Sequence, residues 1–252
     1  MLHRLSTILG IPRDHPQHLL FGGLAVLGVL LIWLGIGLQA WWLLGIPLGL
    51  AVLWLAAVDF RKVFFLMLAS IPLSIERELP GGFATDLPSE PLMWVLTLCG
   101  VGWLLQNLRS IDGRFIRHPL TIALLVHLCW IAISVVTSQD LFVSFKYLLA
   151  KGWYVIVFYC LAAHFLNTER DFKAFFWWFL LPLLFAVMTV FVRHAAIDFS
   201  FQDVAYVMGP FFRNHVMYAC LLAIFLPFIW YATYWYKRWS ATWWFLVGSI
   251  VF

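Results

Sequence analysis

Charged side chains are scarce in this chain, and their scarcity excludes an ordinary water-soluble globular protein. Only 11% of the 252 residues are Asp, Glu, Lys or Arg, whereas 64% are hydrophobic. A typical soluble domain carries about 25% charged residues. A chain with so few charges would aggregate in water, so we expect the lipid bilayer to be its solvent.

Cysteine is also sparse, and the motifs of several enzyme classes are missing. The four cysteines lie inside apolar stretches, in no CxxC or metal-ligand spacing, which favours core packing. They are Cys99, Cys129, Cys160 and Cys220. We find no GxSxG, HExxH or P-loop sequence, and no DxD pair for a metal-bound nucleotide sugar. No metal and no cofactor are therefore expected. The basic residues form no stripe, so nucleic acid is not an expected partner.

Long apolar stretches dominate what is present. A transmembrane helix needs about 20 apolar residues in succession. About nine spans are predicted, the last one incomplete: 18–38, 41–58, 63–75, 92–108, 119–137, 148–166, 174–192, 215–235 and 242 onward. The pattern predicts an all-α, polytopic transmembrane bundle over residues 18–252. Residues 1–17, with leucines on one helical face and arginines on the other, predict an interfacial helix.

Two of these spans are short. Residues 63–75 are interrupted by Pro72, so a re-entrant segment is the alternative to a crossing helix. The stretch from residue 242 reaches only about half of the length needed to cross, and no polar tail follows it. We therefore expect the chain to be the N-terminal part of a longer protein, or a truncated copy of one.

The distribution of basic residues predicts the orientation of the bundle, because cytoplasmic loops carry an excess of Lys and Arg. If residues 63–75 cross, eleven of the 16 basic residues share the side of the N-terminus and five lie opposite. If they do not cross, the division is nine to seven. The stronger bias favours a crossing third span, a cytoplasmic N-terminus and outward loops at 76–91, 138–147 and 193–213.

The outward segment 206–218 (YVMGPFFRNHVMY) holds the main candidate for a binding site. Asn214 is suited to cap the helix that begins after it. Free N–H groups at that helix start and the guanidinium of Arg213 would together bind a phosphate or pyrophosphate. An ordinary interfacial arginine beside a capping asparagine fits the pattern equally well. His215 is a candidate for proton transfer, although a lone histidine is more often structural.

Two further outward segments hold candidate residues. Lys146 and Lys151 are separated by about 140° around a helix. Lys146 near the interface is explained by snorkelling, whereas the deeper ammonium of Lys151 favours a polar cavity. In the Pro- and Gly-rich loop 74–91, Asp86 and Glu90 could orient a sugar hydroxyl or act as a base, or could simply be acids that an outward loop tolerates.

The run 206–227 (YVMGPFFRNHVMYACLLAIFLP) resembles the G-x-F-x-(N/D)-H/N element that enters a transmembrane helix in the O-antigen ligase and O-antigen polymerase superfamily. The segments 72–91 and 144–158 resemble members of the same superfamily. The resemblance implies a multi-pass glycosyltransferase of the bacterial inner membrane. Such an enzyme transfers glycan from an undecaprenyl-diphosphate carrier to lipid A-core, or to another lipid-linked glycan, without nucleotide sugar or obligatory metal.

The same resemblance implies roles for individual residues. Arg213 matches the motif arginine, and with Lys151 and Lys146 it would hold the pyrophosphate. The residue that activates the acceptor would lie in a periplasmic loop after the ninth span, so residues 1–252 alone would not form a competent enzyme. The expected partners are the lipid-linked glycan, its acceptor and membrane lipids. A transporter or flippase for a lipid-linked or anionic solute is the alternative, and a non-catalytic membrane subunit is a third possibility.

Overall fold

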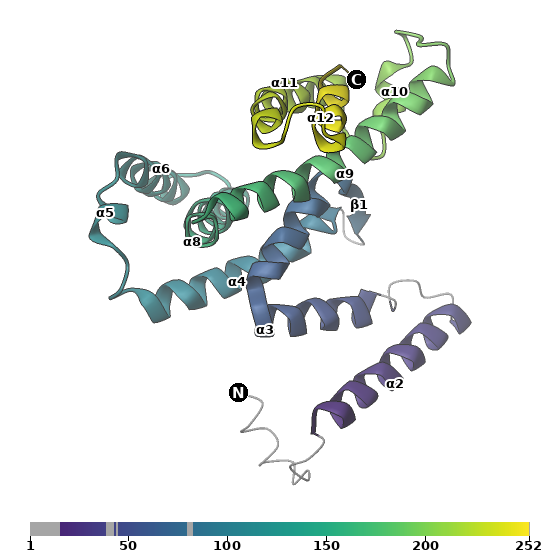
Figure 1. The fold of residues 1–252 in the computed structure, drawn as a ribbon. Coiled ribbons are helices and arrows are strands. Elements are labelled where there is room, and N and C mark those ends of the chain that lie inside the picture. Colours follow the sequence, from purple (N-terminus) through teal and green to yellow (C-terminus); the bar gives the residue numbers. More distant parts are fainter. Residues whose placement is uncertain (1–15, 39–42, 44, 80–82, 252) are drawn as a thin grey trace. The chain divides into compact units, whose positions relative to one another are not determined.

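The computed structural model describes residues 16–38, 43, 45–79 and 83–251, which are helical for most of their length (Figure 1). The chain divides into two compact units, Met1–Phe60 and Arg61–Phe252. The first unit contains α2 (Pro16–Gly37), which coincides with the predicted span 18–38, and most of α3 (Gly45–Ser70). The interfacial helix predicted for 1–17 falls almost entirely outside the described residues.

Helix α3 joins the predicted spans 41–58 and 63–75 into one element. Its backbone leaves helical values at Asp59 (φ −156°, ψ 88°), so two helical segments meet there at a kink. The second segment ends at Ser70, and Pro72 lies in the 3-10 turn η2 (Ile71–Leu73) that follows. Proline lacks the N–H that a continuing helix would need, which explains this end.

The all-α class fits the described residues, which are mainly helical, but the loop that follows α3 contains a short β-hairpin. Strands β1 (Ile75–Leu79) and β2 (Phe83–Leu87) form a two-stranded antiparallel hairpin. Glu76 stands directly opposite Asp86 in its register. The Pro-Gly-Gly sequence between the strands disfavours a helix, and pairing of the two strands satisfies their backbone groups instead.

The remaining elements are α4 (Ser89–Asn107), α5 (Gly113–Ile116), α6 (Pro119–Val136), α7 (Leu141–Val155), the π-helix η3 (Ile156–Leu161), α8 (Ala162–Phe165), α9 (Glu169–Ala195), α10 (Val204–Met208), α11 (His215–Ala232), the 3-10 turn η4 (Thr233–Trp235) and α12 (Ala241–Val251). Each predicted span from residue 92 onward coincides with one of these helices or with the continuous run 141–165. That run begins seven residues before the predicted start at 148.

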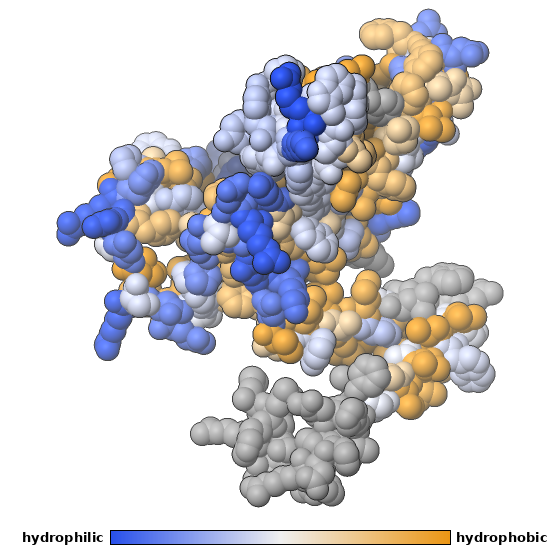
Figure 2. All heavy atoms as spheres, in the orientation of Figure 1, coloured by the Kyte–Doolittle hydropathy of each residue, from blue (hydrophilic) through white to orange (hydrophobic). Residues whose placement is uncertain are grey.

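Within the residues that the structure describes, four helical stretches are long and apolar enough to cross a membrane: Pro119–Val136, Leu141–Phe165, Glu169–Ala195 and His215–Trp235. The protein thus has the character of a helical membrane protein, whereas the predicted total of about nine spans is not confirmed. Large apolar side chains reach the surface in many places (Figure 2). Cys129 and Cys220 are among the exposed residues, so the core-packing prediction is wrong for these two cysteines.

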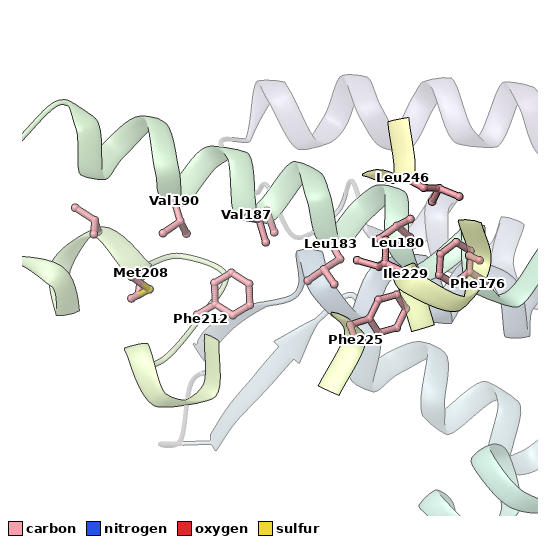
Figure 3. Close-up of a cluster of buried hydrophobic side chains, with 13 residues drawn as sticks. Phe176, Leu180, Leu183, Val187, Val190, Met208, Phe212, Phe225, Ile229 and Leu246 are labelled. Atoms are coloured by element: carbon pink, nitrogen blue, oxygen red, sulfur yellow. The ribbon is translucent and has the colours of Figure 1, made fainter. Parts of the chain in front are cut away.

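A hydrophobic core joins α9 to α10, α11 and α12 (Figure 3). The buried side chains of α9 recur every three or four residues and so form one stripe. They are Phe176, Leu180, Leu183, Ala186, Val187 and Val190. Opposite them lie Met208, Phe212, Phe225, Ile229 and Leu246. Because Phe212 belongs to this core, packing against α9 fixes the backbone beside Arg213.

Candidate functional site

A cavity of about 790 Å³ lies in the second unit, bordered by the end of α3, the hairpin, the start of α4, the α7–η3 helix and the segment before α11. The charged side chains among the described residues that line it are Glu76, Arg77, Asp86, Glu90 and Arg213. Its aromatic side chains are Trp153, Tyr154, Phe158, Phe211 and Phe212. The cavity therefore combines a charged rim with an aromatic wall, a composition typical of ligand sites.

Arg213 bridges two carboxylates of the hairpin. Its Nε lies 3.1 Å from Oε2 of Glu76, and its Nη2 lies 3.3 and 3.4 Å from the two carboxylate oxygens of Asp86. Like charges placed directly opposite on paired strands repel each other. The guanidinium offsets that repulsion and ties the hairpin to the start of α11, 127 residues after Asp86 in the sequence.

The segment that carries Arg213 is held on both sides. The side chain of Asn214 accepts a hydrogen bond of 2.8 Å from the backbone N–H of Met217, so the predicted helix cap is confirmed. On the other side, Arg193 donates to the backbone oxygen of Gly209, and its guanidinium carbon lies 5.8 Å from the ring centroid of Tyr206. These contacts restrict the positions that the Arg213 side chain can reach.

Glu90 occupies the first turn of α4, where the helix dipole favours a carboxylate. The hydroxyl of Thr85 in β2 donates to its Oε2 at 2.7 Å. Its Oε1 has no hydrogen-bond donor within the part of the chain that the structure describes. The backbone N–H of Ser89 donates to the hydroxyl of Ser74 at 3.3 Å, which further ties α4 to the start of the hairpin. Glu90 is thus oriented at the cavity wall with one oxygen left to accept a hydrogen bond.

Three of the six predicted site residues line the cavity: Arg213, Asp86 and Glu90. The other three do not. Lys151 places its Nζ 5.1 Å from the ring centroid of Tyr147, one turn back on α7. Lys146 is exposed on the same helix, and His215 is the exposed first residue of α11. The predicted trio of pyrophosphate-binding cations is therefore not assembled at this cavity.

Lys151 is absent from the lining although neighbouring residues of its helix belong to it. Each residue of an α-helix turns by about 100°, so Lys151 projects about 160° away from Trp153 but only about 60° from Tyr154, and both rings line the cavity. The ammonium of Lys151 lies instead near the ring of Tyr147. The sequence could indicate that Lys151 lies deep in a span, but the phase of the helix relative to its neighbours comes from packing.

Sequence reasoning missed Glu76, Arg77 and the aromatic wall. One signal could have found the first, since Glu76 and Asp86 lie equally far from Gly81, the centre of the Pro-Gly-Gly sequence. A hairpin centred there must place the two acids opposite each other. No comparable local signal marks Trp153 and Tyr154, which reach the cavity through the packing of α7 and η3.

The π-helix η3 supplies part of the cavity wall through Phe158 and packs closely on α4. A Cβ atom added to Gly100 of α4 would lie 2.6 Å from Cγ2 of Ile156 and 3.2 Å from Cδ1 of Leu161. No side chain larger than hydrogen fits at Gly100 without a shift of η3. π-Helical turns are rare and concentrate at functional sites, and this contact holds the η3 segment that carries Phe158 against α4.

Two further observations concern the polar groups of the described residues. No group of three or more His, Cys, Asp or Glu side chains suited to hold a metal ion exists among the residues described. The buried Nε1 of Trp153 lacks a hydrogen-bond acceptor in the described structure. The rings of Trp153 and Trp94 are perpendicular, and their centroids lie 4.7 Å apart.

Comparison of the chain with models of known protein families, with curated proteins and with solved structures found no match.

Proposed function

We propose that the chain is part of a membrane glycosyltransferase of the O-antigen ligase or O-antigen polymerase type. In this proposal the protein lies in the bacterial inner membrane as a multi-pass bundle of about nine spans with a cytoplasmic N-terminus. It takes a glycan from an undecaprenyl-diphosphate carrier and transfers it to lipid A-core or to another lipid-linked glycan. The observation that carries the proposal is the convergence of Arg213, Asp86 and Glu90 on one aromatic-walled cavity.

Arg213 is assigned to the leaving pyrophosphate. During glycosyl transfer the bond between the sugar carbon and the phosphate oxygen breaks, and the pyrophosphate leaves with the electron pair. A fixed cation stabilises the charge that develops on it. The contacts of Arg213 with Glu76 and Asp86 measure 3.1–3.4 Å, longer than the 2.7–2.9 Å of strong charge-assisted hydrogen bonds. The side chain is also 56% exposed, so an entering phosphate can displace either carboxylate.

The balance of charge revises the prediction that lysines complete the site. Three carboxylates and two guanidinium groups line the cavity, which gives these groups a formal charge of −1. Cations therefore do not outnumber carboxylates around this cavity. We assign Arg77, rather than Lys146 or Lys151, as the second cation available to an anionic ligand.

The surplus acids suit the hydroxyl groups of a glycan, since carboxylates accept hydrogen bonds from several donors. Glu90 is assigned to the hydroxyl that attacks. Its Oε1 accepts the hydroxyl proton while the oxygen forms a bond with the sugar carbon. Thr85 holds the other oxygen and so fixes the orientation of the carboxylate. The rings of Trp153 and Tyr154 offer flat apolar surfaces for the faces of a sugar ring.

The test is Arg213→Ala in the full-length parent protein, with Arg238→Ala as the matched control. Arg238 is an exposed arginine in the turn before α12 and does not line the cavity. We expect glycan attachment, measured by O-antigen laddering, to fall by about 100-fold or more in the first variant. The control should retain wild-type laddering. Both variants should insert into the membrane fraction normally.

Wild-type laddering of Arg213→Ala would refute the role of this arginine. A transporter or flippase would give a different result, because its cavity binds the anion without forming a bond. Purified parent protein in vesicles would then move the lipid-linked substrate across the bilayer, and no glycan would be joined to an acceptor. That outcome would replace the glycosyltransferase proposal with the alternative.

A further inference from the structure

A second cavity, of about 540 Å³, runs along one face of α6 and is independent of the site above. We define the α6 groove by its lining residues Arg117, Ile122, Leu125, Val126, Trp130 and Ile133. The last five recur at the spacing of one helical face. They extend along the helix for about 16 Å, roughly half the thickness of the hydrocarbon core of a bilayer. The groove thus has the length of one leaflet.

Arg117 lies at one end of the groove and is the charged residue among the described residues that line it. Trp130, near the other end, is 70% exposed, and Val126 and Ile133 are also exposed. A long apolar surface with a cation at one end matches the form of an amphiphile with an anionic head. The cavity between α6 and α7, bounded by Ser134 and Tyr147, has no such cation among the described residues that line it.

The turn before α6 adds further positive charge at the same end. Arg114 and Arg117 are both exposed there, and no carboxylate in the described part of the chain forms an ion pair with them. The nearby Asp112 is engaged as the cap of α5, since its side chain accepts from the backbone N–H of Arg114 at 2.9 Å. Basic residues beside a membrane attract anionic lipids by about 1 kcal/mol each.

The side chains that form the groove argue against another helix as its occupant. Helices that associate within membranes favour small residues at the contact, because these allow the backbones to approach closely. The α6 groove instead presents branched and aromatic side chains, namely Leu125, Trp130 and Ile133. A flexible acyl chain follows such an uneven surface more readily than a rigid helix does.

We propose that the α6 groove binds an anionic phospholipid, with one acyl chain along Ile122–Ile133 and the phosphate on Arg117. Arg114 adds to the attraction for the head group. The groove selects its ligand by charge at one end and by apolar contact along its length. This assignment is separate from the proposed glycosyl transfer and does not depend on it.

The experiment measures lipid retention by the detergent-purified chain with native mass spectrometry. Phosphatidylglycerol and phosphatidylcholine with identical acyl chains are added in equal amounts. We expect the wild type to retain phosphatidylglycerol in preference. Arg117→Gln should reduce that preference by about fivefold, the effect of one basic residue. Arg238→Gln, which removes an exposed arginine far from the groove in sequence, should leave the preference unchanged.

A second variant tests the apolar part of the groove. Val126→Trp fills the groove with a large side chain and should lower retention of both lipids while the protein elutes as the wild type. Equal retention of the two lipids by the wild type would overturn the proposal, as would an equal loss of preference in Arg117→Gln and Arg238→Gln. Displacement of the lipid by millimolar inorganic phosphate alone would also overturn it, because the site would then recognise a free anion.

Discussion

The core around α9 and the cavity beside Arg213 lie in the same compact unit, but they are built in opposite ways. In the core, apolar side chains from α9, α11 and α12 interlock and leave no charged group inside. Around the cavity, five charged and five aromatic side chains surround a space of about 790 Å³. The apolar side chains of the core contact one another, whereas the polar side chains around the cavity can form hydrogen bonds with another molecule.

The same difference separates two ion pairs of the unit. Arg61 of α3 pairs with Asp171 of α9, and Asp171 also completes the capping box of α9 with Thr168. The side chain of Asp171 is 12% exposed and that of Arg61 is 43% exposed. The side chain of Arg213 is 56% exposed, and those of its partners Glu76 and Asp86 are 42% and 35% exposed. The first pair therefore fastens two helices through a largely buried carboxylate, whereas the carboxylates at the candidate site are more open to solvent.

The largest effect is expected from a substitution in the cavity, and it concerns catalysis. Glu90→Gln keeps the acceptor for Thr85 but removes the charge that we assign to proton transfer. If the proposed function holds, glycan transfer should fall by about 100-fold or more, in line with the contribution of a general base, while thermal stability stays unchanged. The control is Glu78→Gln, an exposed acid of the same hairpin outside the cavity lining. Equal loss in both variants would show that the hairpin, and not Glu90, is responsible.

The next effect concerns the core. Leu183→Ala removes a side chain that is 1% exposed, and we expect it to lower the free energy of unfolding in detergent by about 2–4 kcal/mol. The loss reflects missing van der Waals contacts around the new void, because lipid is as apolar as leucine. Leu181→Ala, at a position that is 52% exposed on the same helix, should change it by less than about 0.5 kcal/mol. Similar losses in both would contradict the assignment of the core face.

The smallest effect is expected at Gly100 of α4, where helix packing meets the wall of the cavity. Gly100→Ala forces η3 to move, and overpacking of this kind costs about 1–3 kcal/mol. Because η3 carries Phe158, glycan transfer should fall as well. Gly102→Ala on the same helix adds a methyl group with no atom within 4 Å, so it should be neutral. Stability is followed by thermal unfolding in detergent; an unaffected Gly100→Ala protein would mean that η3 adapts without cost.

Local sequence patterns predicted most of the helices. The apolar stretches 119–137 and 215–235 match α6 and the α11–η4 run to within a residue, and Asn214 caps α11 as its side chain and position indicated. The cap depends on residues three apart, and the spans depend on continuous stretches. Such features are decided within one element, so a sequence pattern suffices to find them.

The composition of the site depended on contacts that no local pattern contains. Arg213 meets Asp86 across 127 residues, and the ammonium of Lys151 lies near the ring of Tyr147 rather than in the cavity. The predicted spans 41–58 and 63–75 correspond to the two helical segments that meet at the Asp59 kink of α3, a junction that no apolar pattern marks. The sequence could therefore nominate Arg213, Asp86 and Glu90 one at a time, but it could not show that they share a cavity.

The opposition of Glu76 and Asp86 across the hairpin has a thermodynamic consequence for any anion that reaches Arg213. The N–H groups of one guanidinium are limited in number. Each hydrogen bond that Arg213 donates to the ligand therefore weakens its contacts with Glu76 and Asp86. Occupancy and strand pairing would then vary inversely, as linked equilibria require. An anion arriving at α11 would be felt at the adjacent end of the hairpin, where Ile75 pairs with Leu87 and the strands join the end of α3 and the start of α4.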